Sequence, residues 1–152
     1  MFEAKLKELG IEIPEAPKPL AAYVPAKKTG NYVYTAGQLP FKSGKLVCEG
    51  KVGKNVSVEE ATKAAEQSAI NCLSAIKTVT GSIDDIDQIV KLVVFVNSSD
   101  DFTAQPAVAN GASELMVKVF GEAGKNARSA VGVSQLPMNA PVEIEMIVKL
   151  KD

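Results

Sequence analysis

The sequence contains no histidine and no tryptophan, and its two cysteines are Cys48 and Cys72. Without histidine, the chain lacks the commonest general base at neutral pH, the Ser-His and Cys-His nucleophile pairs, and most zinc-binding patterns. The cysteines lie far apart and form no CxxC motif, so a disulfide framework is not expected. Any catalysis is therefore expected to use carboxylates, arginine, tyrosine, backbone groups and water.

Neither sign of charge is in excess, because 17 lysines and arginines stand against 18 aspartates and glutamates, a net charge of -1. This balance gives no support to nucleic-acid binding. No apolar run approaches the roughly 20 residues of a membrane span. The first ten residues alternate charged and apolar side chains and lack the apolar core of a signal peptide. We therefore expect a cytoplasmic protein with no nucleic-acid or membrane partner.

Proline separates a short N-terminal segment from the rest of the chain. Three prolines between residues 13 and 20 predict an extended connector. We therefore divide the chain into an arm, residues 1–19, and a single domain, residues 20–152. In the arm we expect a short surface helix with one apolar side, made by Phe2, Leu6 and Leu9.

Hydrophobic periodicity predicts two long helices in the domain. The first begins at a capping box formed by Ser57 and Glu60 and ends at Gly81, with a stripe of small and apolar residues between them. The second is expected to become regular near Ala107 and to run to Phe120. Acidic residues are favourable at a helix N-terminus, so Asp100 and Asp101 are interpreted as helix-start residues rather than catalytic ones.

Strands are predicted before, between and after these helices. The expected ranges are 23–27, 32–35, a short strand that follows a turn within 41–48, 89–96, 127–133 and 142–150. The run 89–96 is apolar throughout, as in a strand covered on both faces. This order predicts an α+β fold with two helices packed on one face of a mixed sheet. Because the other face also carries apolar residues, we expect an oligomer assembled through the sheets, with pockets at the seams.

Arg128 is the first candidate binding residue. It stands at the entry of a strand whose small residues, Ala130 and Gly132, leave space around it. An arginine, a recess and two nearby carboxylates, Glu143 and Glu145, suit a small anionic ligand. A strand-end surface ion pair would equally explain Arg128 in isolation, and Glu143 could lie on a solvated strand face.

Gly37 is the second unusual feature. A glycine within a strand pattern marks either a β-bulge or a close approach of backbone to a ligand, and the residue type alone does not separate the two.

Two segments carry a recognisable pair of signatures. Residues 23–40 end in Gly-Gln-Leu-Pro, and residues 127–145 combine Arg-Ser-x-Val, Leu-Pro and Glu-x-Glu. Together, in type and spacing, they resemble the RidA/YjgF family of reactive-intermediate (enamine/imine) deaminases, as a divergent branch. The resemblance spans residue 20 to the C-terminus. It implies a chorismate-mutase-like fold and a homotrimer whose three pockets lie between subunits and hydrolyse 2-imino or enamine acids to 2-oxo acids and ammonia, without metal or organic cofactor.

The resemblance also implies roles for individual residues. Arg128 matches the arginine that clamps the substrate carboxylate, and Glu143 matches the glutamate near the attacking water. Gly37 matches the glycine whose backbone approaches the ligand, and Tyr23 matches a tyrosine of the pocket wall, although it could equally be a packing residue. Three further substrate-binding positions are Leu39 of the Gly-Gln-Leu-Pro signature, Ala36, where many members have Ser, and Ala130, where many have Cys.

Two alternatives to catalysis remain. Because Ala36 and Ala130 reduce the number of polar contacts in the pocket, the protein could instead be a non-catalytic binding or regulatory protein for a small carboxylate metabolite. An endoribonuclease or translation-inhibitor role is disfavoured by the charge balance, the absence of histidine and the lack of a basic-aromatic strip.

Overall fold

The computed structural model describes residues 1–18 and 21–152, so the expected boundary between residues 19 and 20 lies outside the described residues. Five strands form one mixed sheet in the order β1-β2-β7-β5-β6. Strands β5 and β6 are parallel, and the other neighbours are antiparallel. The strands are β1 (Ala26–Thr29), β2 (Tyr32–Thr35), β5 (Ile86–Asn97), β6 (Ala127–Val133) and β7 (Val142–Leu150).

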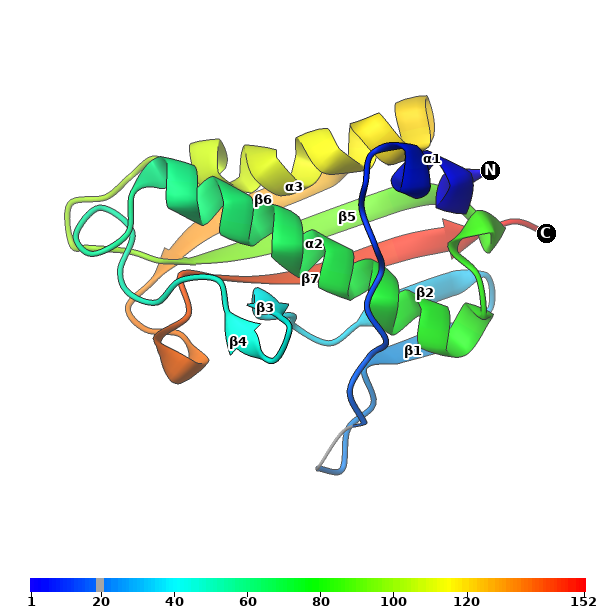
Figure 1. Ribbon diagram of the computed structural model, residues 1–152, viewed down its shortest axis with the longest axis horizontal. Helices are drawn as coiled ribbons and strands as arrows, with labels where there is room; N and C mark the ends of the chain where they lie inside the picture. Colours follow the sequence, from blue (N-terminus) through cyan, green and yellow to red (C-terminus); the bar gives the residue numbers. More distant parts are fainter. Residues whose placement is uncertain (19–20) are drawn as a thin grey trace.

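The two long helices, α2 (Val58–Thr80) and α3 (Gln105–Phe120), lie side by side on one face of this sheet (Figure 1). The predicted α+β fold, with two helices on one face of a mixed sheet, is therefore confirmed. A short helix, α1 (Phe2–Glu8), packs near the end of α3. The remaining elements are a hairpin, β3 (Phe41–Lys42) and β4 (Lys45–Leu46), and three single turns, η1 (Ile83–Asp85), η2 (Gly121–Gly124) and η3 (Pro137–Asn139).

Helix α2 begins and ends as its sequence predicts. The Glu60 N–H donates to Ser57 Oγ at 3.1 Å, and the Ser57 N–H donates to Glu60 Oε2 at 2.9 Å, which completes the capping box. Gly81 ends the helix with a φ of +81°. Helix α3 packs closely against α2 at Gly111, where only the absence of a side chain allows the contact. A Cβ at this position would clash with the backbone carbonyl of Thr62.

Several expected boundaries are wrong. Strand β1 begins at Ala26 rather than at residue 23, because Pro25 has no N–H to donate to a neighbouring strand. Helix α3 begins at Gln105 rather than near residue 107, with a proline in its first turn, where no N–H is needed. Asp100 and Asp101 precede its N-cap and do not cap it.

The arm packs more closely than a purely surface position implies. Leu6 of α1 is buried in the core, whereas Leu9, expected on the same apolar side, is exposed. The Ser74 hydroxyl of α2 donates to the Pro14 carbonyl, which fastens the connector to the domain. No helix in residues 1–18 or 21–152 is both long enough and apolar enough to cross a bilayer.

The sheet has one covered face and one open face. The helix-covered face holds the predicted alternating residues of β7, which are all buried: Val142, Ile144, Met146, Val148 and Leu150. In β5, Leu92 and Val94 are buried, but Val93 and Phe95 are partly exposed, so within one chain this strand is covered on one face rather than two. Side chains on the open face include Tyr32, Tyr34 and Val131, which are 41%, 44% and 45% exposed.

Candidate functional site

Arg128 lies on the edge strand β6 and turns toward helix α3. Its Nη1 donates to Asn110 Oδ1 at 2.9 Å and to Ser113 Oγ at 3.3 Å, and both acceptors belong to α3. In the described part of the chain, Arg128 forms no ion pair with a carboxylate. Its guanidinium is therefore held by neutral groups, and no carboxylate in the described residues offsets its charge.

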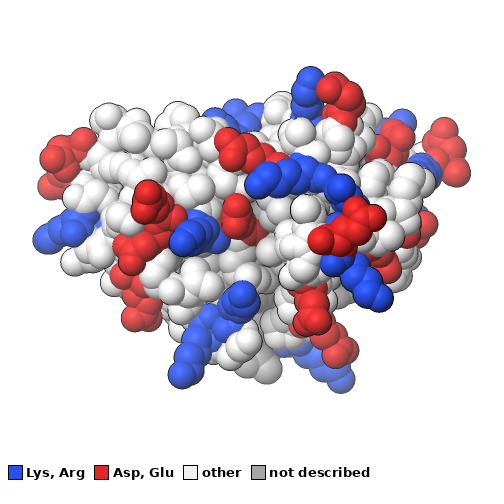
Figure 2. Space-filling view, turned by 45° about the horizontal axis from the view of Figure 1, so that its top comes forward, with Lys and Arg blue, Asp and Glu red and all other residues white. Residues whose placement is uncertain are grey.

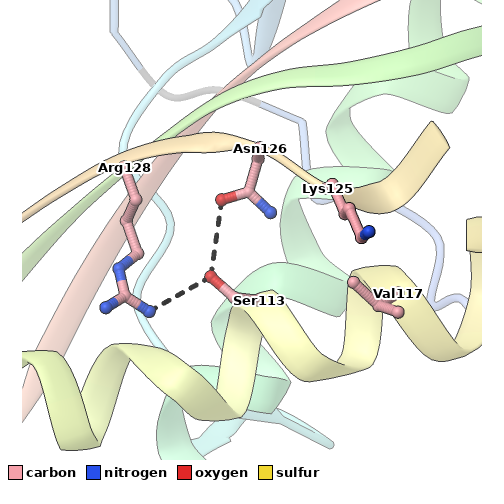
Figure 3. Close-up of a pocket in the computed structure, with 5 residues that line it drawn as sticks. All are labelled: Ser113, Val117, Lys125, Asn126 and Arg128. Carbon is pink, nitrogen blue, oxygen red and sulfur yellow. Dashed lines mark hydrogen bonds between the residues drawn. The ribbon is translucent and has the colours of Figure 1, made fainter. Parts of the chain in front are cut away.

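A recess of about 430 Å³ lies beside this guanidinium, between α3 and the start of β6 (Figure 3). The turn η2 delivers the chain into β6, and its Gly124 packs so closely on the α3 backbone that a Cβ would clash with the carbonyl of Met116. Two cationic side chains and no acidic one line the recess, and one of these cations, Lys125, forms an ion pair with Glu122 at 2.9 Å. The residues that form this Arg128 recess are Ser113, Val117, Lys125, Asn126 and Arg128.

Glu143 lies on β7, next to a bulge that reaches it from β2. Tyr34 pairs with Ile147 and Gln38 with Ile144, so the four steps from 34 to 38 stand opposite three from 147 to 144. One extra residue is therefore present on the β2 side, which is the definition of a β-bulge. Thr35 completes the hydrogen bonding there, because its Oγ1 accepts from the Met146 N–H at 3.0 Å.

Gly37 lies in this bulge, directly against the Glu143 side chain. A Cβ at Gly37 would stand 2.6 Å from Glu143 Oε1, closer than any Cβ can be without a shift of the carboxylate. Of the two interpretations left open for Gly37, the structure shows the bulge, and the group that approaches its backbone within the chain is Glu143. We refer to Ala36, Gly37 and Glu143 as the Glu143 cluster.

The environment of Glu143 opposes its ionisation. Burial removes water from the carboxylate and raises the pKa of Glu143 above its ordinary value of 4.5, and the negative charge of Glu145 raises this pKa further. Glu143 forms no ion pair within the described residues. A carboxylate with a raised pKa is a better proton acceptor than one exposed to water.

Within one chain, the Arg128 recess and the Glu143 cluster lie on opposite faces of the sheet. Arg128 pairs with Leu92, and Glu143 pairs with Phe95, both on β5. Because side chains alternate between the faces of a strand, positions 92 and 95 belong to different faces. The expectation that Glu143 and Glu145 lie near Arg128 is therefore wrong within a single chain, since the intervening β5 sets a register that the local sequence does not encode.

The other predicted site residues lie in three places: on β6 near Arg128, at the Glu143 cluster, and against helix α2. Ala130 follows Arg128 on β6 and packs against the core. Ala36 N–H donates to the Pro25 carbonyl at 2.8 Å, which places Pro25 beside the Glu143 cluster, whereas Tyr23, two residues before Pro25, is exposed. The carbonyl of Leu39 accepts from Asn71 Nδ2 at 3.0 Å.

Three residues around Arg128 were missed from the sequence: Asn110, Ser113 and Asn126. Their position depends on how α3 is rotated against β6, which periodicity does not determine. The available signal was the spacing of Asn110 and Ser113, two polar residues three apart in a helix whose neighbouring positions, Val108 to Ala112, are otherwise small or apolar.

The buried thiol of Cys72 is unsuited to nucleophilic chemistry. Burial raises its pKa to about 12, so the thiolate is not populated at neutral pH. The Thr35 hydroxyl donates to Cys72 Sγ at 3.8 Å, and the thiol donates to the Ile144 carbonyl at 3.3 Å. Among the residues that the structure describes, no group of three or more carboxylates and thiols has the arrangement of a metal site.

Comparison with known proteins places this chain in a family. The sequence profile of the family described as "YjgF/chorismate mutase-like, putative endoribonuclease" matches residues 3–150. Protein TCP17 of Trypanosoma cruzi is 42% identical over 150 residues, which cover 98% of this chain and 94% of that protein. The 2-iminobutanoate/2-iminopropanoate deaminase of Dermatophagoides farinae is 32% identical over 141 residues, 93% of this chain and 95% of that one.

Solved structures agree with the sequence comparison. The crystal structure of the protein Atu1372 with unknown function from Agrobacterium tumefaciens superposes with a TM-score of 0.91 at 44% identity, covering 99% of this chain and 93% of that one. The profile match, the sequence relatives and the common fold all extend over almost the whole chain. The protein belongs to the RidA/YjgF family.

Proposed function

We propose that this protein hydrolyses 2-imino acids and their enamine tautomers to 2-oxo acids and ammonia, at pockets between the subunits of a homotrimer. The arrangement around Arg128 carries this proposal: a guanidinium held by neutral acceptors, beside a recess, and free to bind an anion. The family relative named as a 2-iminobutanoate/2-iminopropanoate deaminase supports the choice of reaction.

A trimer would bring the two halves of the site together. Rotation about a threefold axis joins two different surfaces of neighbouring subunits, unlike a twofold dimer contact, which joins one surface to itself. One surface would be the β6 edge with Arg128, and the other would be the open face with Glu143. The partly exposed Tyr34 and Val131 of that open face give such an interface its apolar area.

The chemistry follows from the two charged groups. Arg128 binds the substrate carboxylate by two parallel hydrogen bonds, which fix its orientation. Glu143 accepts a proton from water as the water oxygen bonds to the imine carbon, and it passes this proton to the nitrogen. The C–N bond then breaks as the new hydroxyl gives up its remaining proton through Glu143 to the departing nitrogen, so that ammonia and the 2-oxo acid leave and Glu143 is again a carboxylate. The imine carbon is already electrophilic and no oxidation occurs, so the proposed reaction needs no metal or organic cofactor.

The test generates 2-iminobutyrate from threonine with a threonine dehydratase and follows the remaining imine by trapping with semicarbazide. We expect the purified protein to accelerate imine decay, Arg128→Ala to abolish the acceleration, and light scattering to give the mass of three chains. Unchanged decay with the wild-type protein, or equal acceleration by Arg128→Ala, would contradict the proposal.

One observation favours a second candidate, a non-catalytic binding protein for a small carboxylate. Ala36 and Ala130 have neither a hydroxyl nor a thiol to contact a reacting group or water. Calorimetry with 2-oxobutyrate separates the two functions: binding that Arg128→Ala removes, without imine turnover, would favour the binding protein. The family description also contains the words "putative endoribonuclease", but basic and acidic side chains are interspersed on the face seen in Figure 2, which does not favour RNA binding on that face.

A further inference from the structure

The hydrogen bonds of Arg128 leave one edge of its guanidinium free. A guanidinium has five N–H donors, and the two donors on Nη1 are used by Asn110 Oδ1 and Ser113 Oγ. Within the described chain, Nε and Nη2 have no hydrogen-bond acceptor. The Nε–Nη2 edge is one of the two edges that match the spacing of carboxylate oxygens. The protein therefore holds Arg128 by one nitrogen and leaves a carboxylate-binding edge exposed.

The acceptors on the protein side are fixed in direction by a short chain of hydrogen bonds (Figure 3). The Asn126 Nδ2 group donates to the Gly124 carbonyl at 2.9 Å, so the amide oxygen of Asn126 turns toward Ser113. The single hydroxyl hydrogen of Ser113 is donated to this oxygen, at 3.4 Å. With its hydrogen donated to Asn126, Ser113 Oγ offers its lone pairs to Arg128.

Every hydrogen-bond acceptor in this network around Arg128 is neutral. A carboxylate at either α3 position would hold Arg128 at least as firmly, but it would also neutralise the charge that attracts an anionic ligand. Amide and hydroxyl oxygens give direction without that loss. Building on the proposed function, we infer that Asn110, Ser113 and Asn126 are positioning residues that orient Arg128 for the substrate carboxylate while leaving its charge uncompensated.

The main test is Asn110→Asp, which keeps the size of the side chain and its hydrogen bond but adds a negative charge. We expect the affinity for 2-oxobutyrate, measured by calorimetry, to fall on the order of tenfold or more. The KM for 2-iminobutyrate should rise by a similar factor with little change in kcat, and the melting temperature should stay level or rise. If Asn110 were merely structural, this variant would bind 2-oxobutyrate as the wild type does, and that result would overturn the inference.

Asn55→Asp is the matched control. Asn55 lies in an exposed loop, where its Oδ1 accepts from the Lys51 N–H at 3.3 Å, and the change alters the net charge by the same amount. It should leave ligand affinity and KM unchanged. An equal loss of affinity in Asn55→Asp would show that net charge, rather than neutralisation of Arg128, causes the effect, and would also overturn the inference.

A second measurement needs no ligand. NMR of the arginine side chain reports how fast the Arg128 guanidinium rotates, and we expect slow rotation in the wild type, faster rotation in Ser113→Ala, and slow rotation again in Ser113→Thr. Free rotation in the wild type would overturn the inference. A protein that binds 2-oxobutyrate but hydrolyses no imine would refute the proposed reaction alone, whereas a protein that binds no carboxylate would refute both.

Discussion

The two charged residues of the candidate site, Arg128 and Glu143, have opposite environments. Arg128 is surrounded by groups that satisfy part of its hydrogen bonding and hold it in place. Glu143 has the reverse environment, since burial and the nearby Glu145 raise its pKa and destabilise its ionised form. A residue that binds a ligand works best when its side chain is already held in the binding orientation. A general base works best when its ionised form is destabilised, because its raised pKa makes it a stronger proton acceptor. The contrast predicts different consequences for stability and for activity when either residue is changed.

The largest effect is expected from Arg128→Ala. Two charge-assisted hydrogen bonds to the substrate, each contributing about 1.5–3 kcal/mol, correspond to a loss of about 10²–10⁴ in kcat/KM. Arg128→Lys keeps the charge but not the two parallel donors, so it should fall between the wild type and Arg128→Ala. Imine-decay kinetics check both variants, with circular dichroism to confirm folding. Full activity in Arg128→Lys would show that charge alone suffices and that orientation contributes nothing.

Glu143→Gln is expected to lower kcat by about 10²-fold. This factor is at the lower end of the range for general-base catalysis, because an imine carbon is already electrophilic and needs little activation of the attacking water. The same change should stabilise the fold at neutral pH. A carboxyl whose pKa is raised by folding contributes stability that is fully present below its unfolded pKa and is lost as the pH rises through its folded pKa. At pH 7 the ionised Glu143 therefore opposes folding, and glutamine removes this cost.

Thermal melts at two pH values test the stability half of that prediction. The melting temperature of Glu143→Gln should exceed that of the wild type at pH 7, and the difference should shrink as the pH falls toward 4.5, the ordinary pKa of a glutamate. A variant that is less stable than the wild type at pH 7 would mean that the carboxylate makes favourable contacts in the assembled protein.

An intermediate effect is expected from Gly37→Ala. The new Cβ would meet Glu143 Oε1, the movable end of a side chain, so the carboxylate should shift while the backbone stays in place. Displacing a reacting group in this way should lower kcat by roughly tenfold, with little loss of stability. The double variant with Glu143→Gln should be no slower than Glu143→Gln alone, because the methyl group acts only through the carboxylate. Additive losses would assign Gly37 a separate role.

The sequence predicts the local parts of this site better than their assembly. The capping box at Ser57 and the alternation of β7 depend on short-range rules, and each is found in the structure. At Gly37 the sequence left a bulge and a close approach of the backbone to a ligand as equal alternatives, and the strand pairing shows the bulge. The position of Arg128 beside small residues is also local.

The relation between the two halves is not local. Strands β6 and β7 follow one another in the chain, but β5 lies between them, and its register places Arg128 and Glu143 on opposite faces. The contacts of Asn110 and Ser113 with Arg128 depend in the same way on the rotation of α3 against the sheet. Patterns of apolar residues indicate that α3 packs on the sheet, but not which polar residues it turns toward the edge strand.

The smallest effect is expected from Glu145→Gln. Glu145 and Glu143 pair with Val93 and Phe95, two residues apart on β5, so both carboxylates lie on the open face. The negative charge of Glu145 is the second cause of the raised pKa of Glu143, after burial. Removing it should shift the acid side of the kcat–pH profile to lower pH without abolishing it, because burial still disfavours the ionised form. A profile that does not move would mean that solvent screens Glu145 from Glu143, and that burial alone sets the pH at which Glu143 becomes a base.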